Sequence, residues 1–302
     1  MRSRETLGLL LGITGVVIFG GSLPMTRYAV TALDPWFITV SRAAIAGLAA
    51  ILVVAMLRRP LPNRAALPKL ALSALLLVGG FPGFTGIAMA TVPASHGGVV
   101  VGLLPLATAT ASAILMRERP SLAFWLCGIA GAALVVAFAV LHGGAQGFAA
   151  GDALLLLAVA SAAVGYTISA SLSRTMPGWE VISWCVILAL PVTIPATLWL
   201  WPADAGAIGG DIWAALAYLG LMSMYLGFFF WNAGMAMGGV ARVSQTQLLQ
   251  TFVTLGFAAL INGETIDGAT LAFAVAVVLV VMIGRRTRIA STQAQPTERS
   301  RS

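Results

Sequence analysis

The sequence predicts an all-α integral membrane protein in which ten helices cross the bilayer as two inverted five-helix repeats around a central cavity. Three observations favour this fold class: apolar segments of membrane-spanning length, basic residues gathered on one side of them, and a repeated hydropathy pattern. The chain has 302 residues, of which 59% are hydrophobic and only 9% are charged. Soluble domains carry about 25% charged residues, so this chain has too little polar surface to stay in water.

Ten apolar segments follow one another along the chain with short connections. A helix needs about 20 apolar residues to cross the hydrocarbon core, with a range of roughly 17–25, and every segment fits that window. The predicted crossings are 6–28, 35–57, 70–90, 94–116, 122–141, 153–172, 181–201, 212–235, 239–261 and 266–283.

The basic residues fall on one side of these crossings. Lys and Arg are enriched on the cytoplasmic side of membrane proteins, which sets the orientation. We therefore expect a multi-pass protein of the inner (plasma) membrane with both termini in the cytoplasm. The inner side collects Arg2, Arg4, Arg58, Arg59, Arg64, Lys69, Arg117, Arg119, Arg174, Arg242, Arg285, Arg286, Arg288, Arg299 and Arg301. The outer loops carry Asp34, Asp152, Asp204, Asp211, Glu264 and Asp267.

The net charge of +7 comes mostly from the same basic residues that set the orientation in the membrane. In a soluble protein it would suggest nucleic acid as a partner. Here the expected macromolecular partner is the lipid bilayer, with some attraction to anionic headgroups, and no nucleic acid.

The second half of the chain repeats the first at a fixed offset. Glu118 and Glu264 each lie in a tight loop between two apolar segments, and subtracting 118 from 264 gives an offset of 146 residues. The hydropathy pattern of crossings one to five recurs in crossings six to ten. Five is an odd number, so the second copy enters the membrane from the opposite side. Inverted repeats are typical of secondary transporters, whose substrate site lies near the midplane between the halves.

Short motifs in both halves resemble the EamA type of the drug/metabolite transporter superfamily. In the first half they are Pro35 and Arg42, then Pro105, then the run Leu115-Met116-Arg117-Glu118-Arg119, then Gly128 and Gly131. In the second half they are Asn262-Gly263-Glu264 and the crossing that follows. The second copy departs from the pattern, with Asn-Gly where Leu-Gly is usual and Thr251 opposite Pro105. The resemblance implies a ten-helix exporter or permease of small metabolites, nearest to the aromatic and broad amino-acid exporters.

Crossing nine carries the clearest polar stripe. Gln247, Gln250, Thr251 and Thr254 share one helical face by their spacing. Amides and hydroxyls together can bind a polar solute with both donors and acceptors. The alternative is hydrogen bonding between helices, worth about 0.6 kcal/mol per contact in a membrane.

Other polar and aromatic residues inside the crossings are candidates for the same site, because polar groups in hydrocarbon need a cavity or a partner. Arg42 is the strongest exception to the one-sided placement of charge, and it could bind a substrate carboxylate, extend to the interface or pair with Asp34. His96 could titrate near neutral pH or lie at the headgroup level. The remaining substrate-binding candidates are Asn232, Trp231, Tyr225, Tyr166, Ser169, Phe84 and Ser22.

Several activities are excluded by what the sequence does not contain. There is no Walker-type phosphate loop, so this chain does not use ATP. No catalytic grouping, metal site or cofactor motif is found, and Cys127 and Cys185 are interpreted as buried hydrophobic residues. We expect no Asp or Glu inside a crossing, which leaves His96, an arginine or the termini to couple transport.

The sequence thus predicts a secondary transporter, not an enzyme, that exports small metabolites, amino acids first, by alternating access. Another cargo such as a nucleoside, sugar or drug is the alternative. Residues 1–147 form the first repeat, 148–288 the second, and 289–302 a disordered cytoplasmic tail. Crossings five and ten are expected to act as scaffold or self-association surface, so the protein is a monomer or a homodimer.

Overall fold

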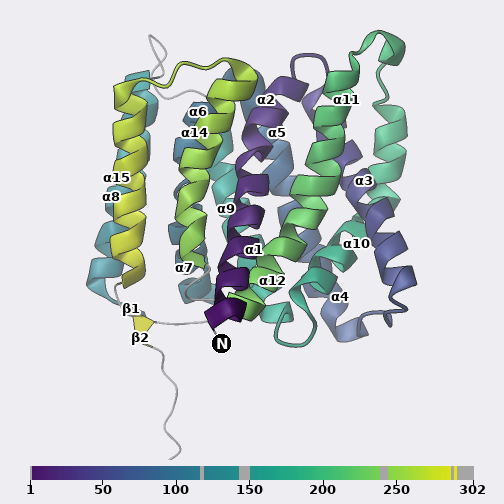
Figure 1. Ribbon diagram of the computed structural model, residues 1–302, viewed down its shortest axis with the longest axis horizontal. Helices are drawn as coiled ribbons and strands as arrows, with labels where there is room; N and C mark the ends of the chain where they lie inside the picture. The colour runs from purple at the N-terminus through teal and green to yellow at the C-terminus, as the bar shows by residue number, and fades with distance from the viewer. Residues whose placement is uncertain (1, 116–118, 143–149, 239–243, 287–288, 291–302) are drawn as a thin grey trace, which may run out of the picture.

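The computed structural model describes residues 2–115, 119–142, 150–238, 244–286 and 289–290. Their regular secondary structure is helical apart from one pair of two-residue strands (Figure 1). The first half contains α1 (Arg2–Gly20), α2 (Ser22–Ala29), α3 (Pro35–Met56), α4 (Leu67–Ala74), η2 (Leu75–Gly80), α5 (Phe81–Thr91), α6 (Ala94–Val101), α7 (Leu104–Leu115) and α8 (Leu122–His142). The second half contains α9 (Ala150–Leu172), α10 (Gly178–Trp199), α11 (Gly210–Ala217), η5 (Tyr218–Leu226), α12 (Gly227–Gly238), η6 (Ser244–Leu248), α14 (Leu249–Asn262) and α15 (Gly268–Arg286). Short 3₁₀ turns lie at η1 (Arg64–Ala66) and η4 (Ala205–Ala207).

The prediction of an all-helical protein with membrane-length apolar segments is confirmed. Seven continuous helical stretches in the described residues are long and apolar enough to cross a membrane, and 122–138 and 268–284 are shorter apolar helices. The predicted count of ten crossings stays a prediction. The predicted disordered tail starts at 289, whereas Ile289 and Ala290 form the strand β2 (Ile289–Ala290), which pairs with β1 (Arg119–Pro120). The rest of the tail and the loop residue Glu118 lie outside the described residues.

Three of the predicted crossings in the first half are interrupted, and proline accounts for much of this. Proline lacks a backbone N–H, so the carbonyl four residues earlier loses its helical donor. Pro24 follows the break between α1 and α2, and the carbonyl that lacks a helical donor because of it belongs to Gly20. The Thr254 hydroxyl of α14 donates to that carbonyl at 2.9 Å. Pro105 likewise lies just after the break between α6 and α7.

Wider π-helical turns interrupt the third crossing of each half. The segment η2 covers residues 75–80 and η5 covers residues 218–226. Adding the sequence offset of 146 to the first places it on 221–226, inside the second. π-Helical segments are rare and frequently lie at functional sites. The two halves therefore share a local backbone irregularity as well as a hydropathy pattern.

Close helix contacts follow from small residues. Helix α1 packs along α12, and a Cβ placed on Gly234 would lie 2.7 Å from the Gly12 backbone nitrogen and 2.9 Å from the Gly8 carbonyl. Gly8 and Gly12 thus let α1 and α12 approach closely. Helices α8 and α15 pack against each other at one edge of the bundle (Figure 1).

Carboxylates bind the free backbone N–H groups at the starts of α3 and α6. Asp34 accepts hydrogen bonds from the backbone N–H groups of Trp36 and Phe37 at the start of α3. Glu264, from the loop after α14, accepts from the backbone N–H groups of Ala94 and Ser95 at 2.7 and 2.8 Å, at the start of α6. The Glu that marks the repeat in the sequence thus joins the second half to the first.

Candidate functional site

A cavity lies at the centre of the bundle, between the two halves. It holds about 670 Å³ of empty space including its open mouth. Within the described residues, α8 and α15 contribute nothing to its lining, whereas both halves contribute several helices. The lining residues are Phe19, Ser22, Leu23, Arg42, Leu77, Phe81, Pro82, Val101, Leu104, Tyr166, Ile182, Ser223, Met224, Phe228, Gln247 and Gln250.

Four pairs of lining residues are equivalent under the 146-residue offset. They are Leu77 with Ser223, Pro82 with Phe228, Val101 with Gln247, and Leu104 with Gln250. Equivalent positions of the two halves therefore face one cavity, as expected for a site on a repeat axis. In three of these pairs the first half supplies an aliphatic side chain and the second half supplies a polar one.

Arg42 brings the positive charge of the site. It lies in the second turn of α3 and its residue is only 4% exposed. Its Nη2 donates to the Ser223 Oγ at 3.1 Å, and Ser223 Oγ lies 2.5 Å from Ser22 Oγ. The alternative that Arg42 pairs with Asp34 is wrong, because Asp34 caps the start of its own helix. Burial of the side chain also rules out extension to the interface.

Aromatic rings form the apolar wall. Phe19 of α1 meets Phe228 of α12 edge to face, with centroids 5.0 Å apart. Tyr166 of α9 lies 6.3 Å from Phe228, and Phe81 of α5 completes the aromatic lining. The cavity therefore combines a cation, hydroxyls and amides with an aromatic surface, which suits an amphipathic solute.

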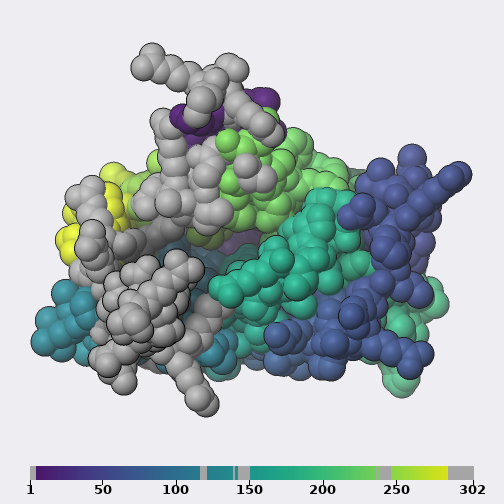
Figure 2. Space-filling view, turned by 90° about the horizontal axis from the view of Figure 1, so that it is seen from below, coloured from purple at the N-terminus to yellow at the C-terminus, as the bar shows by residue number. Residues whose placement is uncertain are grey.

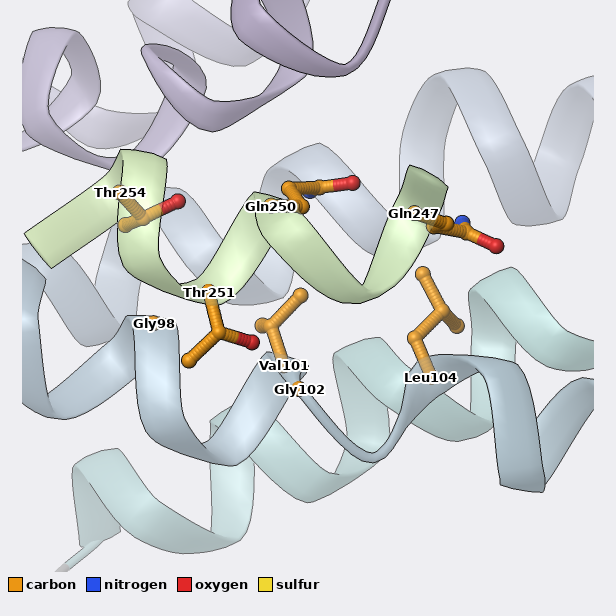
Figure 3. A pocket seen from close by; sticks show the side chains of 8 residues that line it. All are labelled: Gly98, Val101, Gly102, Leu104, Gln247, Gln250, Thr251 and Thr254. Carbon is orange, nitrogen blue, oxygen red and sulfur yellow. The ribbon is translucent and has the colours of Figure 1, made fainter. Parts of the chain in front are cut away.

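The polar stripe of crossing nine divides between two environments. Gln247 and Gln250 line the central cavity, and the same residues with Thr251 and Thr254 border a smaller cleft of about 260 Å³ where α14 crosses α6 (Figure 3). Thr251 points toward Gly102, where an added Cβ would lie 2.8 Å from its Oγ1 (Figure 3). The structure thus brings the four predicted residues together, with the two threonines packed between helices.

Some predicted site residues lie away from the cavity. Tyr225 is 1% exposed, packs in the core formed by α3, α4 and α10, and shares a 2.9 Å hydrogen bond with Ser183. Asn232 lies against Gly178 at the start of α10, where an added Cβ would be 2.8 Å from its Cγ. The backbone of Trp231 faces α1. Ser169 and Phe84 are half-buried in α9 and α5 and do not border the cavity.

His96 also lies outside the cavity, in a buried pair that the sequence did not predict. His96 Nε2 lies 2.6 Å from Asp152 Oδ1, and the residues are 8% and 3% exposed. The His96 ring packs on Phe138 of α8 with centroids 4.7 Å apart. The expectation of a loop position for Asp152 is wrong, because the residue lies in the first turn of α9. A buried carboxylate therefore does exist, and it links α6 of the first half to α9 of the second.

Further polar contacts join the two halves at the ends of the helices. Arg59, after α3, pairs with the buried Glu180 of α10 and lies 5.6 Å from the centroid of the Trp179 ring. Figure 2 shows the bundle from below, with the blue segment that follows α3 beside the teal-green segment around the start of α10. At the other end of the bundle, the Tyr28 hydroxyl donates to Asp211 of α11.

The Glu264 carboxylate is held in its charged form. Burial alone would raise its pKa, but hydrogen bonds from the Ser95 hydroxyl, from the backbone N–H groups of Ser95 and Ala94, and from the Asn262 amide lower the pKa below its usual value. Helix α6 thereby has an anion at its N-terminus, where the helix dipole favours negative charge.

No metal centre is evident in the part of the chain that the structure describes, which contains no group of three or more His, Cys, Asp and Glu side chains. Cys127 and Cys185 are free thiols. The chemistry available at the cavity is therefore binding by hydrogen bonds, one cation and aromatic surface.

Sequence reasoning missed several lining residues, chiefly Ser223, Phe19 and Ile182. The repeat could have pointed to Ser223, because the equivalent position in the first half holds the aliphatic Leu77. A polar residue in one copy opposite an aliphatic residue in the other marks a position where the halves differ in chemistry.

Comparison with known proteins gives three findings. The EamA-like transporter family matches residues 6–141 and again 149–284. The chain is 42% identical over 284 residues to a Bacillus subtilis (strain 168) protein named "Uncharacterized transporter YdeK", covering 94% of this chain and 99% of that one. A solved structure titled "Crystal structure of protein" resembles it with a TM-score of 0.63 and 22% identity, over 94% of this chain and 98% of that chain. At that identity the likeness shows the fold alone.

Proposed function

The chain belongs to the EamA-like transporter family of the drug/metabolite transporter superfamily, and we propose that it exports small metabolites, amino acids first, through the central cavity. As a member it is a multi-pass membrane transporter. Export proceeds by alternating access, in which the two five-helix halves rock against each other so that the cavity opens to one side at a time.

The observation that supports this proposal best is the set of equivalent positions that line one cavity from both halves. A site on the repeat axis changes its accessible side when the halves exchange conformations. Broken helices around such a site are typical of secondary transporters. Here the break between α6 and α7 and the start of α14 both border the small cleft beside the cavity.

The arrangement that we propose has ten crossings, with residues 1–147 and 148–288 as inverted repeats. Both termini lie on the cytoplasmic side of the inner membrane, on the face that carries Arg58, Arg59 and Lys69. The protein acts as a monomer or homodimer. The paired helices α8 and α15 leave Leu122 and Ile129 exposed at the edge of the bundle, where lipid or a second copy can cover them.

The cargo proposal follows from the lining. Amides of Gln247 and Gln250 and the hydroxyls of Ser22 and Ser223 bind a polar head, and the aromatic wall binds an apolar side chain. An amphipathic amino acid presents both parts.

Counterflow in proteoliposomes tests the proposal. Vesicles containing the purified protein are loaded with one unlabelled solute, and uptake of labelled amino acids, nucleosides and sugars is measured. We expect exchange of at least one amphipathic amino acid, reduced severalfold in Gln250→Ala and unchanged in Asn232→Ala, whose side chain lies outside the cavity. Exchange of a nucleoside or sugar without any amino acid would reject the cargo, and equal exchange by both variants would reject the cavity as the site.

A further inference from the structure

We propose that Arg42 is the recognition site for a carboxylate of the cargo, so that the protein selects organic acids by this group and does not require their ammonium group. This inference rests on the proposed transport function and narrows its substrate class. It is carried by the burial of Arg42, by its incomplete hydrogen bonding and by the absence of an acidic lining residue.

Arg42 has donors that the protein leaves unused. A guanidinium has five N–H donors and no acceptor. In the described part of the chain, the one side-chain hydrogen bond of Arg42 goes from Nη2 to Ser223, and its buried Nε has no partner. The Nε and Nη groups on one edge of a guanidinium match the two oxygens of a carboxylate.

Arg42 also lacks an anionic neighbour among the described residues. The ion pairs there are Arg59 with Glu180 and His96 with Asp152. A buried charge without a counterion is costly, so such a residue is kept for a partner that arrives from outside. Since Arg42 lines the cavity, a cargo anion can reach it.

Two serines, Ser22 and Ser223, lie beside the Arg42 guanidinium and help to orient it. Ser223 accepts from Arg42, and Ser22 lies within hydrogen-bonding distance of Ser223. The Ser223 hydroxyl thereby takes up one N–H of Nη2, and the other N–H groups of the guanidinium make no side-chain hydrogen bond in the described part of the chain. The Ser22 hydroxyl, which comes from the first half like Arg42, offers a further hydrogen bond to a bound carboxylate.

The described lining residues include one cation, Arg42, but no carboxylate that could bind the ammonium group of an amino acid. None of the described lining residues is Asp or Glu. An amino acid would therefore be bound through its carboxylate, with its ammonium group bonded at most by neutral hydroxyls and amides. A 2-hydroxy acid with the same side chain, which has a hydroxyl in place of the ammonium group, should bind equally well or better.

Ligand binding to the purified full-length protein in detergent tests the inference. The probes are phenylalanine, 3-phenyllactate, phenylalaninamide and 2-phenylethylamine, which share a ring that suits the aromatic wall. We expect the first two to bind with similar affinity and the two without a carboxylate to bind at least tenfold more weakly. Arg42→Gln and Arg42→Lys should weaken both acids by about 10- to 100-fold, the range for losing a charged hydrogen bond.

The matched control is Arg27→Gln. Arg27 is half-buried in α2 and donates to the Met89 carbonyl at 2.5 Å, outside the cavity, so its replacement should leave the affinity order unchanged. If Arg42→Gln does not elute as a folded protein, Arg42→Lys and the ligand series on the unaltered protein still decide the question.

The outcomes separate this inference from the proposed function. If phenylalaninamide or 2-phenylethylamine binds and exchanges in proteoliposomes as well as the acids do, transport stands and the carboxylate site is rejected. Full affinity for acids in Arg42→Gln would reject it too. If no probe binds and no amino acid is exchanged, the proposed cargo fails together with the inference.

Discussion

Replacement of Thr254 by valine tests whether the break after α1 is repaired by a helix of the other half. Pro24 has no N–H to give to the Gly20 carbonyl, and the Thr254 hydroxyl supplies the donor at 2.9 Å. Valine keeps the shape of the side chain and removes the hydrogen bond. Hydrogen bonds between helices in membranes average about 0.6 kcal/mol, with a maximum of about 1.7, and an orphaned buried carbonyl costs about 1–3. We expect Thr254→Val to lower the free energy of unfolding by about 1–2 kcal/mol.

The assay is reversible unfolding in mixed detergent micelles, performed in two backgrounds. In Pro24→Ala the new N–H of residue 24 can bond the Gly20 carbonyl within the helix. Neighbouring bonds already follow this pattern, since Gly21 donates to the Val17 carbonyl and Met25 to the Gly21 carbonyl. Thr254→Val should therefore cost little in the Pro24→Ala background. An equal cost in both backgrounds would show that the Thr254 hydroxyl does not compensate for Pro24.

The remaining predictions concern contacts between the two halves. Glu264 has a folded-state pKa below its unfolded value. The stability that it contributes is therefore complete above about pH 4.3 and is lost as the pH falls through the folded pKa. In Glu264→Gln the free energy of unfolding should fall less steeply at acid pH, which unfolding curves measured over a pH series can show. Gly234→Ala should destabilise the α1–α12 contact by about 1–3 kcal/mol in thermal unfolding, whereas Gly256→Ala, which faces open space, should not. Asp152→Ala should cost about 1–3 kcal/mol, and the cost should shrink when His96 is already replaced by leucine, as a double-mutant cycle can measure.

Much of the fold could be predicted because its determinants are local. The length of the apolar segments predicted the helices, and the structure has seven helical stretches in its described residues that are long and apolar enough to cross a membrane. The repeat was readable because Glu264 occupies a fixed place in a tight loop. Its structural role, capping α6 in the other half, depends on tertiary packing and could not be read from spacing.

The site could be predicted only in part, because a polar residue in a membrane helix can satisfy itself in several ways. Gln250 and Arg42 turn to the cavity, whereas Tyr225 bonds Ser183 in the core. The choice depends on the rotation and tilt of each helix, which hydropathy does not determine. The pair of His96 and Asp152 was missed because a residue at a helix start is indistinguishable in sequence from a loop residue.

The proposed transport requires that cargo binds in the cavity on the repeat axis. It is tested most directly by replacing polar lining residues with their equivalents from the first half, Gln247→Val and Gln250→Leu together, and measuring amino-acid counterflow in proteoliposomes. We expect a folded protein whose exchange rate falls at least tenfold, since the cavity loses both amides. An exchange rate equal to that of the unaltered protein would contradict it.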